Sequence, residues 1–204
     1  MPPIGSAQQR IYKAALQLFA ERGVMQVSVS ELAEAAGVAR GTIYNNLEQP
    51  EVLFESVAAA LAADMDRHNE QLFATVEDPA ARLATGMRLW IRRAHAEPHW
   101  GRFLARFAFS NATLQGMWSG PPVADLLKGI QEGRYACRQE QLPSVVGMIA
   151  GTVLGAIFLV LEGRRTWRDA GEDAAELVLI ALGIPRDEAR ALASAELPSL
   201  AEVA

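Results

Sequence analysis

Side chains that can each donate a hydrogen bond crowd one short segment of the chain. They are Arg40, Thr42, Tyr44, Asn45 and Asn46. Ile43 and Leu47 lie four residues apart and give the same segment an apolar side that can pack on a protein core. Such donors bind phosphate oxygens and the acceptor atoms of base edges, and a short helix fits the DNA major groove. The pattern predicts a helix that contacts DNA.

A second short helix is expected to position this donor face. Ser28 and Glu31 have the spacing of a capping box, in which the hydroxyl accepts the Glu31 N–H and the carboxylate accepts the Ser28 N–H. Gly37 stands where a helix ends in the left-handed conformation that glycine adopts without a side-chain penalty. Residues 28–47 are therefore predicted to form two helices joined at Gly37, which is the arrangement of a helix-turn-helix.

The positions around these helices match a family pattern, which runs F-x-x-x-G, then T-x-x-x-I-A-x-x-A-G-V-S-x-G-T-x-Y-x-H-F, then K-x-x-L. The matching residues are Phe19, Gly23, Ser28, Leu32, Ala33, Ala36, Gly37, Val38, Gly41, Thr42, Tyr44 and Leu53. On these residues the stretch from Ile11 to Leu53 resembles the N-terminal domain of the TetR family of transcriptional regulators. The resemblance implies an all-α fold, with a three-helix DNA-binding domain over residues 1–49 and a larger helical domain for effector binding and dimerisation over residues 50–204.

The resemblance also assigns roles on the donor face. Thr42 and Tyr44 match family positions that touch phosphate, whereas Arg40 and Asn45 match positions that reach bases. An arginine can pair with guanine and an asparagine with adenine. Alternatively, the Tyr44 ring packs on the first helix with its hydroxyl in water. The predicted DNA-binding set is completed by Ser28, Gly41 and Asn46.

The DNA-binding module departs from the family pattern in its cap and its charge. Ala39 replaces the usual Ser or Thr, so the second helix lacks a side-chain cap, which is worth about 1 kcal/mol. Through Glu55 the chain has six acidic residues and four basic ones, which gives a net charge of −2. We expect modest DNA affinity with a weak dependence on salt. The four basic residues are Arg10, Lys13, Arg22 and Arg40.

Composition limits the class of protein. The 204 residues are 50% hydrophobic and carry a net charge of −5, which argues against disorder and against general polyanion binding. The single cysteine, Cys137, cannot form an internal disulfide, and the N-terminus has no apolar signal segment, so a cytoplasmic location is expected. His68, His95 and His99 lack the spacing of a metal site, and we expect neither metal nor cofactor.

The remainder of the chain has helical periodicity with short Pro or Gly breaks and no strand pattern. We expect helices from Pro50 into the seventies and over Pro79–Glu97, Trp100–Phe107, Val123–Tyr135, Leu142–Gly163, Asp173–Leu182 and Pro185–Ala195.

The segment from Gln141 to Leu161 has no charged residue and has the length and apolarity of a transmembrane helix. Glycines at every fourth position let two helix backbones approach closely. A helix buried by its own domain on one side and by a second subunit on the other explains the same pattern. The family resemblance implies this pairing, in a four-helix bundle, so we predict a homodimer and no membrane contact. The predicted interface residues are Gly147, Gly151, Gly155, Phe158, Leu177 and Ile180.

Large apolar side chains gather between residues 86 and 118. Trp90, Phe103, Phe107 and Trp118 are predicted to line an effector site, with His95 or Arg106 orienting a polar group of the ligand. The alternative is that these aromatic residues only fill a core. An aromatic or largely apolar small molecule is the expected effector.

A homodimeric repressor that leaves a palindromic double-stranded operator on binding an effector explains these features best. Such an effector must bind the DNA-free conformation more tightly than the DNA-bound one. One alternative is a helical enzyme that uses its first domain for docking, but no nucleophile–base pair, phosphate loop or metal cluster supports it, and no catalytic residue is expected. The other is a membrane-tethered regulator that pairs through Gly147–Gly155.

Overall fold

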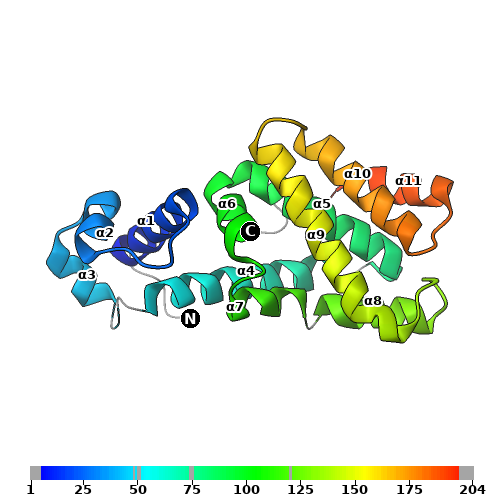
Figure 1. Ribbon diagram of the computed structural model, residues 1–204, viewed down its shortest axis with the longest axis horizontal. Helices are drawn as coiled ribbons and strands as arrows, with labels where there is room; N and C mark the ends of the chain where they lie inside the picture. The colour runs from blue at the N-terminus through cyan, green and yellow to red at the C-terminus, as the bar shows by residue number, and fades with distance from the viewer. Residues whose placement is uncertain (1–5, 48, 50–51, 74–75, 120, 198–204) are drawn as a thin grey trace.

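The computed structural model describes residues 6–47, 49, 52–73, 76–119 and 121–197, without the side chains of residues 6, 65–73 and 121. These residues form α-helices and short 3-10 turns, and none of them lies in a strand. The molecule is elongated, with the three N-terminal helices at one end and the remaining helices in a larger body (Figure 1). The all-α fold with an N-terminal helix-turn-helix is confirmed.

Three helices form the N-terminal end. They are α1 (Ser6–Arg22), α2 (Val29–Ala36) and α3 (Arg40–Asn46). Each contributes apolar side chains to a shared core, in which Ile11, Leu32 and Ile43 are buried. This burial fixes the direction of α3, because its apolar side must face the core and its polar side must then face solvent.

Helix α4 (Leu53–Phe73) joins this end to the body (Figure 1). Its first turns pack against α1 and bury Phe54 and Val57. The expected start at Pro50 lies outside the described residues.

The body is built around α5, which contacts α6, α8, α9, α10 and α11. Asp78 caps its first turn by accepting the N–H groups of Ala80 and Ala81, both at 3.3 Å. The elements of the body are α5 (Pro79–Ala96), α6 (Pro98–Phe107), α7 (Ala112–Gln115), η2 (Gly116–Trp118), α8 (Pro121–Gln131), η3 (Gln139–Gln141), α9 (Leu142–Leu161), α10 (Trp167–Ala181) and α11 (Arg186–Ser194).

Helix α10 begins well before the expected start at Asp173. Thr166 is its N-cap, because the Thr166 hydroxyl accepts the N–H of Asp169 at 3.1 Å. The expectation was wrong because a polar, Arg- and Asp-containing stretch resembles a loop, although a capped first turn carries such residues readily.

Two features between α6 and α9 differ from expectation: the end of α8 and the presence of α7. Helix α8 stops before Tyr135, because Gly133 has a φ of 70° and ends the helix in the left-handed conformation. Helix α7 was not expected at all. It is a single turn that Asn111 caps by accepting the Leu114 N–H at 3.0 Å.

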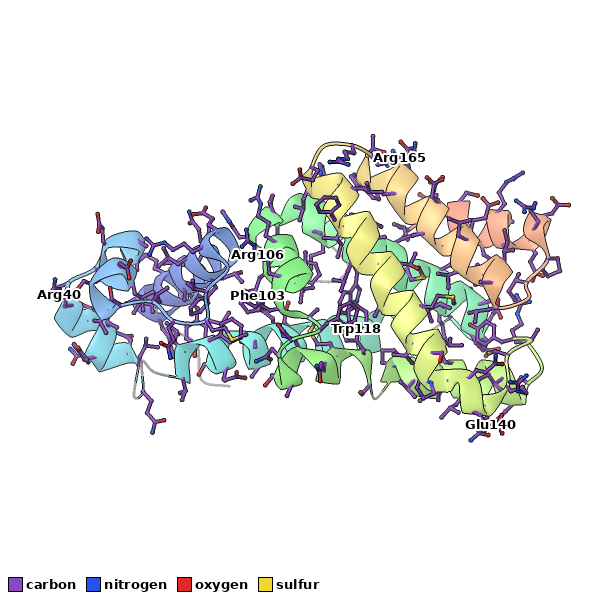
Figure 2. All side chains as sticks on the ribbon, in the orientation of Figure 1. Arg40, Phe103, Arg106, Trp118, Glu140 and Arg165 are labelled. Carbon is purple, nitrogen blue, oxygen red and sulfur yellow. The ribbon has the colours of Figure 1, made fainter. Side chains whose placement is uncertain are left out.

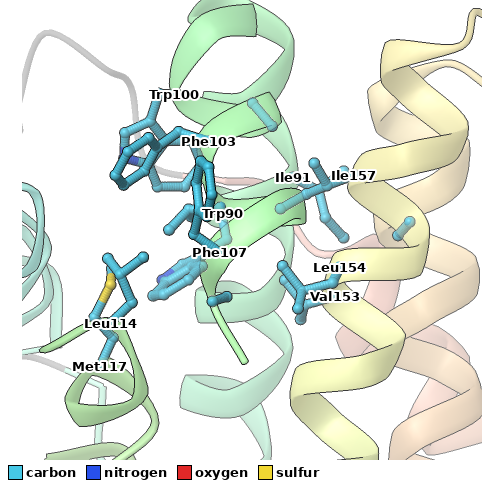
Figure 3. Packing of buried hydrophobic residues seen from close by; sticks show 14 of the residues in the cluster. Trp90, Ile91, Trp100, Phe103, Phe107, Leu114, Met117, Val153, Leu154 and Ile157 are labelled. Carbon is cyan, nitrogen blue, oxygen red and sulfur yellow. The ribbon is translucent and has the colours of Figure 1, made fainter. Parts of the chain in front are cut away.

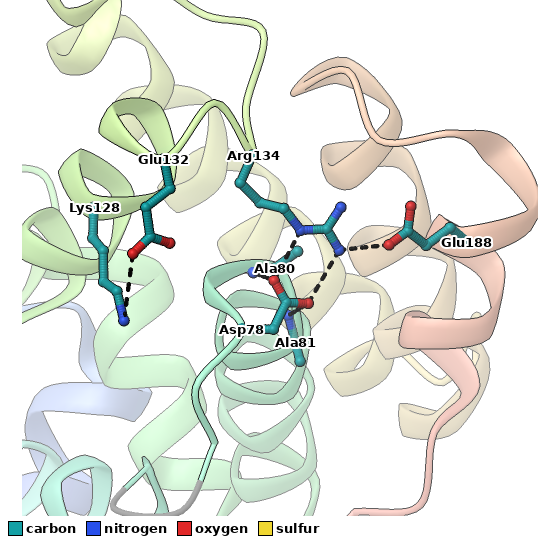
Figure 4. Close-up of polar contacts among 7 residues, drawn as sticks. All are labelled: Asp78, Ala80, Ala81, Lys128, Glu132, Arg134 and Glu188. Carbon is teal, nitrogen blue, oxygen red and sulfur yellow. Dashed lines mark hydrogen bonds and ion pairs between the residues drawn. The ribbon is translucent and has the colours of Figure 1, made fainter.

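A long-range polar cluster closes the end of the body away from α3 (Figure 4). Arg134 donates to both carboxylate oxygens of Asp78, at 2.8 and 3.1 Å, and to Glu188 at 2.6 Å. These hydrogen bonds with Arg134 lower the pKa of the Asp78 carboxyl below its ordinary value. The cluster therefore ties the start of α5 to the loop after α8 and to α11.

Candidate functional site

The capping box at the start of α2 is present as predicted. The Ser28 hydroxyl accepts the Glu31 N–H at 3.2 Å, and the Ser28 N–H donates to the Glu31 carboxylate at 2.9 Å. Arg22 at the end of α1 forms an ion pair with the same carboxylate. The hydrogen bonds with the Ser28 side chain, with Arg22 and with the Ser28 backbone lower the pKa of the exposed Glu31 carboxyl from 4.5 to about 2.

The turn between α2 and α3 has the predicted left-handed residue. Gly37 has φ 62° and ψ 41°, and the Val38 N–H that follows donates to the Ala33 carbonyl at 3.0 Å. Helix α3 then starts at Ala39 without a side-chain cap, as the sequence predicted. The Thr42 N–H donates to the Ala39 carbonyl at 2.9 Å, so among the described residues the N–H groups of Arg40 and Gly41 are the ones that the missing cap leaves to an external acceptor.

The solvent-facing side of α3 carries the predicted donors at the tip of the molecule (Figure 2 labels Arg40). Arg40 and Asn45 are exposed, and 62% of the Tyr44 side chain is accessible, so the ring does not pack deeply on α1. Gly41 is also exposed, and no neighbouring segment among the described residues lies within 4 Å of the place of a β-carbon there. The protein itself therefore gives no packing reason for a glycine at this position.

Thr42 and Asn46 differ from the other donors because both are half-buried. The Asn46 side chain donates to the Thr42 carbonyl at 2.8 Å, one turn back along the same helix. One of its two amide hydrogens is thus used within α3. Asn46 retains one donor and its carbonyl oxygen for contact with DNA.

Exposed cations are few at this end of the molecule. Arg22 is held by Glu31, which leaves the exposed side chains of Arg10, Lys13 and Arg40 to meet phosphates. Most contacts on this surface would consequently come from neutral donors and backbone N–H groups.

Aromatic side chains connect the N-terminal end to the body. Phe54 on α4 packs against Phe19 on α1, at 5.1 Å between ring centroids. It also packs against Phe103 and Phe107 on α6, at 5.2 and 5.0 Å. Phe103 and Phe107 were predicted to line an effector site, and the structure places them at the junction between α6 and the first turns of α4.

Tryptophans form the adjoining part of the buried core (Figure 3). Trp90 on α5 packs against Trp100 on α6, at 5.8 Å between centroids, and against Trp118 in η2, at 4.9 Å. The structure thus brings together Trp90 and Trp118, both of which were predicted for the effector site, and adds Trp100, which was not.

The two polar residues predicted for the effector site lie elsewhere. His95 is exposed near the end of α5, and Arg106 is exposed on α6 (Figure 2). The Arg106 guanidinium lies over the backbone of Gly23 at the end of α1. Arg106 thus lies on the side of α6 that faces the end of α1. The role of His95 and Arg106 in effector binding stays a prediction.

The residues predicted for the dimer interface lie on the outer side of α9 and α10. Gly147, Gly151 and Gly155 are all exposed, and a β-carbon at any of them would meet no neighbouring segment among the described residues within 4 Å. Phe158 is 48% exposed and Leu177 65% exposed, whereas Ile180 is half-buried. The subunit therefore leaves an apolar surface uncovered, which we call the α9–α10 face.

Sequence reasoning missed a tether between the two parts of the molecule. Glu55 at the start of α4 accepts hydrogen bonds from Asn111 at 2.7 Å and from Thr113 at 2.9 Å. The tether joins α4 to α7, which continues into η2 and Trp118. No local pattern could have revealed it, because the partners lie far apart in the sequence.

No group of three or more His, Cys, Asp or Glu side chains in the described part of the chain is arranged to hold a metal ion. Cys137 is a free, half-buried thiol.

Comparison with known proteins identifies the family. Residues 78–195 match the profile described as "Tetracyclin repressor-like, C-terminal domain", and residues 11–47 match "Bacterial regulatory proteins, tetR family". The first match alone spans more than half of the chain. The chain belongs to the TetR family of DNA-binding transcriptional regulators, a family that is not enzymatic. The predicted domain boundary at residues 49 and 50 falls between the two matches and stays a prediction.

Curated relatives match mainly through the N-terminal part. The HTH-type transcriptional regulator AcrR of Shigella flexneri is 42% identical over 50 residues, which is 24% of this chain and 23% of AcrR. An HTH-type regulator of Mycobacterium tuberculosis is 29% identical over 92 residues, which is 45% of this chain and 46% of the relative. The chain thus aligns with less than half the length of these relatives.

Solved structures match over nearly the whole chain. RolR in complex with resorcinol is 28% identical, with a TM-score of 0.69, and covers 95% of this chain and 96% of RolR. FadR from Bacillus subtilis in complex with stearoyl-CoA is 21% identical, with a TM-score of 0.65 over 85% of this chain and 96% of FadR, and shows the fold alone. Related regulators therefore bind small molecules of different chemistry.

Proposed function

We propose that this TetR-family regulator is a homodimeric repressor that holds a palindromic operator through α3 and releases it when a small molecule binds the body. The observation that carries the proposal is the solvent-facing donor surface of α3, braced by the Gly37 turn. Ser28, Arg40, Gly41, Thr42, Tyr44, Asn45 and Asn46 are its proposed DNA-contacting residues.

Dimerisation is supported by the α9–α10 face. The helical segment Gln139–Leu161 has the length and composition of a membrane span. Only 39% of its most apolar stretch is buried inside the chain. An exposed apolar surface of this kind marks an interaction site, and a second copy of the chain covers it without a membrane. A twofold dimer also presents α3 twice, which matches two half-sites of a palindrome. We propose a cytoplasmic location on the same grounds.

Release by an effector is supported by the contacts between body and DNA-binding end. The Glu55 tether and the Phe54 ring link α4 to α7 and to α6, so that a shift of either segment moves the helix that carries the DNA-binding end. An effector acts by binding the shifted conformation more tightly than the DNA-bound one.

Operator selection followed by fluorescence anisotropy tests the proposal. The full chain is used to select duplexes from a random-sequence pool, and binding to the selected duplex is then measured. Arg40→Ala should change which sequences are preferred, because a base contact is lost. Tyr44→Phe should weaken all duplexes alike, because a phosphate contact is lost. Failure to select any duplex sequence would contradict the proposed operator binding.

A further inference from the structure

Two buried indole N–H groups lack an acceptor. The Nε1 atoms of Trp100 and Trp118 are shielded from solvent, and neither has a hydrogen-bond partner among the described residues. Trp100 is wholly buried. A buried donor without an acceptor destabilises a fold, and native proteins contain few of them. Such donors in the same core point to an acceptor that the described part of the chain does not supply.

Both donors belong to rings that contact Trp90. The centroid distances are 5.8 Å for Trp100 and 4.9 Å for Trp118, and the three tryptophans come from α6, η2 and α5. The surrounding side chains are apolar, since Leu114 and Met117 are buried close to this cluster (Figure 3). Apart from the Arg93 guanidinium, which lies 4.8 Å from the centroid of the Trp100 ring, the indole N–H groups therefore lie near apolar side chains.

The cluster is accessible from one side. Trp118 is half-buried, whereas Trp100 is enclosed, so the Trp118 ring is the side of the cluster at which we propose that a ligand enters. Element η2 lies against α4 and directly follows α7, which the Glu55 tether joins to α4. A ligand at Trp118 would thus act next to the segment that links the body to the DNA-binding end.

The arginine next to the Trp100 ring is already paired with carboxylates. The Arg93 guanidinium lies 4.8 Å from the centroid of the Trp100 ring, but it forms ion pairs with Asp64 at 2.6 Å and with Glu97 at 3.1 Å. A charged ligand would meet no uncompensated charge from this arginine. An indole N–H donates only, so the ligand must supply the acceptor, and tryptophan faces favour a flat ring.

We propose that Trp100 and Trp118 are the hydrogen-bond donors of the effector site, and that the site takes a small, neutral aromatic molecule bearing a hydroxyl or carbonyl oxygen. This inference rests on the proposed function, in which the body binds an effector. The indole N–H groups take the polar role that the sequence assigned to His95 and Arg106.

Calorimetric titration of the full chain tests the donors with matched probes. Resorcinol carries acceptor oxygens, whereas m-xylene places methyl groups on the same ring positions. Trp118→Phe and Trp100→Phe keep an aromatic ring and remove the N–H. Each should weaken resorcinol binding by roughly three- to tenfold and leave m-xylene binding unchanged. Trp167→Phe on α10 is the control and should change neither. Equal resorcinol affinity in all variants, or no resorcinol binding at millimolar concentration, would overturn the inference.

Indole NMR provides a readout that does not depend on the variants' folding. In the unmodified chain labelled with ¹⁵N-tryptophan, resorcinol should shift the indole signals of Trp100 and Trp118 and leave that of Trp167 in place. Unshifted signals at saturation would overturn the inference even if a variant fails to fold. Operator binding by the same protein is measured in parallel. If a duplex is bound and stearoyl-CoA but not resorcinol releases it, the donor site fails and the repressor stands. If no duplex is bound, the proposed function fails.

Discussion

The Arg106 guanidinium covers the backbone of Gly23, so closely that a β-carbon at position 23 would lie 2.1 Å from Arg106 Nη1. Gly23 has a φ of 68° and ends α1, whereas Arg106 belongs to the last turn of α6. His99, on the same helix, adds a second contact between these elements, with Nδ1 3.8 Å from Glu21 Oε1. The end of α1 therefore packs closely against α6.

Gly23→Ala is expected to lower the free energy of unfolding by about 1–2 kcal/mol, because the left-handed backbone disfavours a side chain. Thermal unfolding measures the change. The Arg106 guanidinium is the flexible end of a long side chain and can move aside for the new methyl group. Most of the loss of stability caused by Gly23→Ala should therefore persist in an Arg106→Ala background. Gly116→Ala is the control, because Gly116 has a helical φ of −57° and open space around it. A larger loss at Gly116 than at Gly23 would contradict the argument.

Gly41→Ala should separate stability from DNA binding. Position 41 is helical and exposed, so alanine should raise the stability of the module by up to about 1 kcal/mol. If the DNA backbone approaches this position closely, the added methyl group should weaken operator binding. Thermal unfolding and anisotropy on the same protein measure the two effects. An unchanged operator affinity would show that the glycine does not serve DNA contact.

The Glu31 carboxyl predicts an acid-sensitive DNA-binding end. Its pKa is lowered in the folded state to about 2 from 4.5, so the stabilisation is fully present above pH 4.5 and is lost as the pH falls toward 2. The Tm of the wild type should therefore exceed that of Glu31→Gln at neutral pH, and the two values should converge in acid. Asp169→Asn is the control, because it removes an acidic side chain from the first turn of α10, outside the DNA-binding end. A difference that stays constant down to pH 2 would exclude the carboxylate as its source.

Local features of the helix-turn-helix could be predicted because their causes lie within a few residues. The Ser28–Glu31 box, the Gly37 turn and the uncapped start at Ala39 each depend on backbone geometry that adjacent residues determine. Thr166 and Asp169 carry a similar capping signal at α10, with the T-x-x-D spacing, which the apolar periodicity alone does not reveal.

The surroundings of Arg106, which was predicted for the effector site, could not be predicted in the same way. The spacing of α6 shows which residues share a side, but not which side the distant α1 covers. Arg106 therefore faces Gly23 instead of the tryptophan cluster. The pairing of Arg134 with Asp78 and Glu188 is equally long-range, because three separate segments must first fold together.

Gly151→Leu is expected to convert the proposed dimer to a monomer. Gly151 is exposed on α9 with open space around it in the single subunit, so a leucine there should not disturb the fold. It would prevent the close approach of two α9 helices. Light scattering coupled to size-exclusion chromatography measures the mass. Ala191→Leu, on an exposed position of α11, is the control and should leave the dimer intact. A dimeric Gly151→Leu protein, or a monomeric wild type, would place the α9–α10 face outside the interface.

Operator binding should depend only weakly on salt. Each phosphate neutralised by a side chain contributes about −0.9 to the slope of log affinity against log salt. Arg10, Lys13 and Arg40 are the exposed cations of the module that do not pair with Glu31, so a dimer that places all of them on phosphates should give a slope of about −5 or shallower. Anisotropy across a salt series measures it. Lys13→Ala should flatten the slope further, whereas Asn45→Ala should reduce affinity without changing the slope, because a neutral amide displaces no counterion. A slope near about −10 would require phosphate contacts from cations outside these three, and the N-terminal helices could then not account for the DNA affinity.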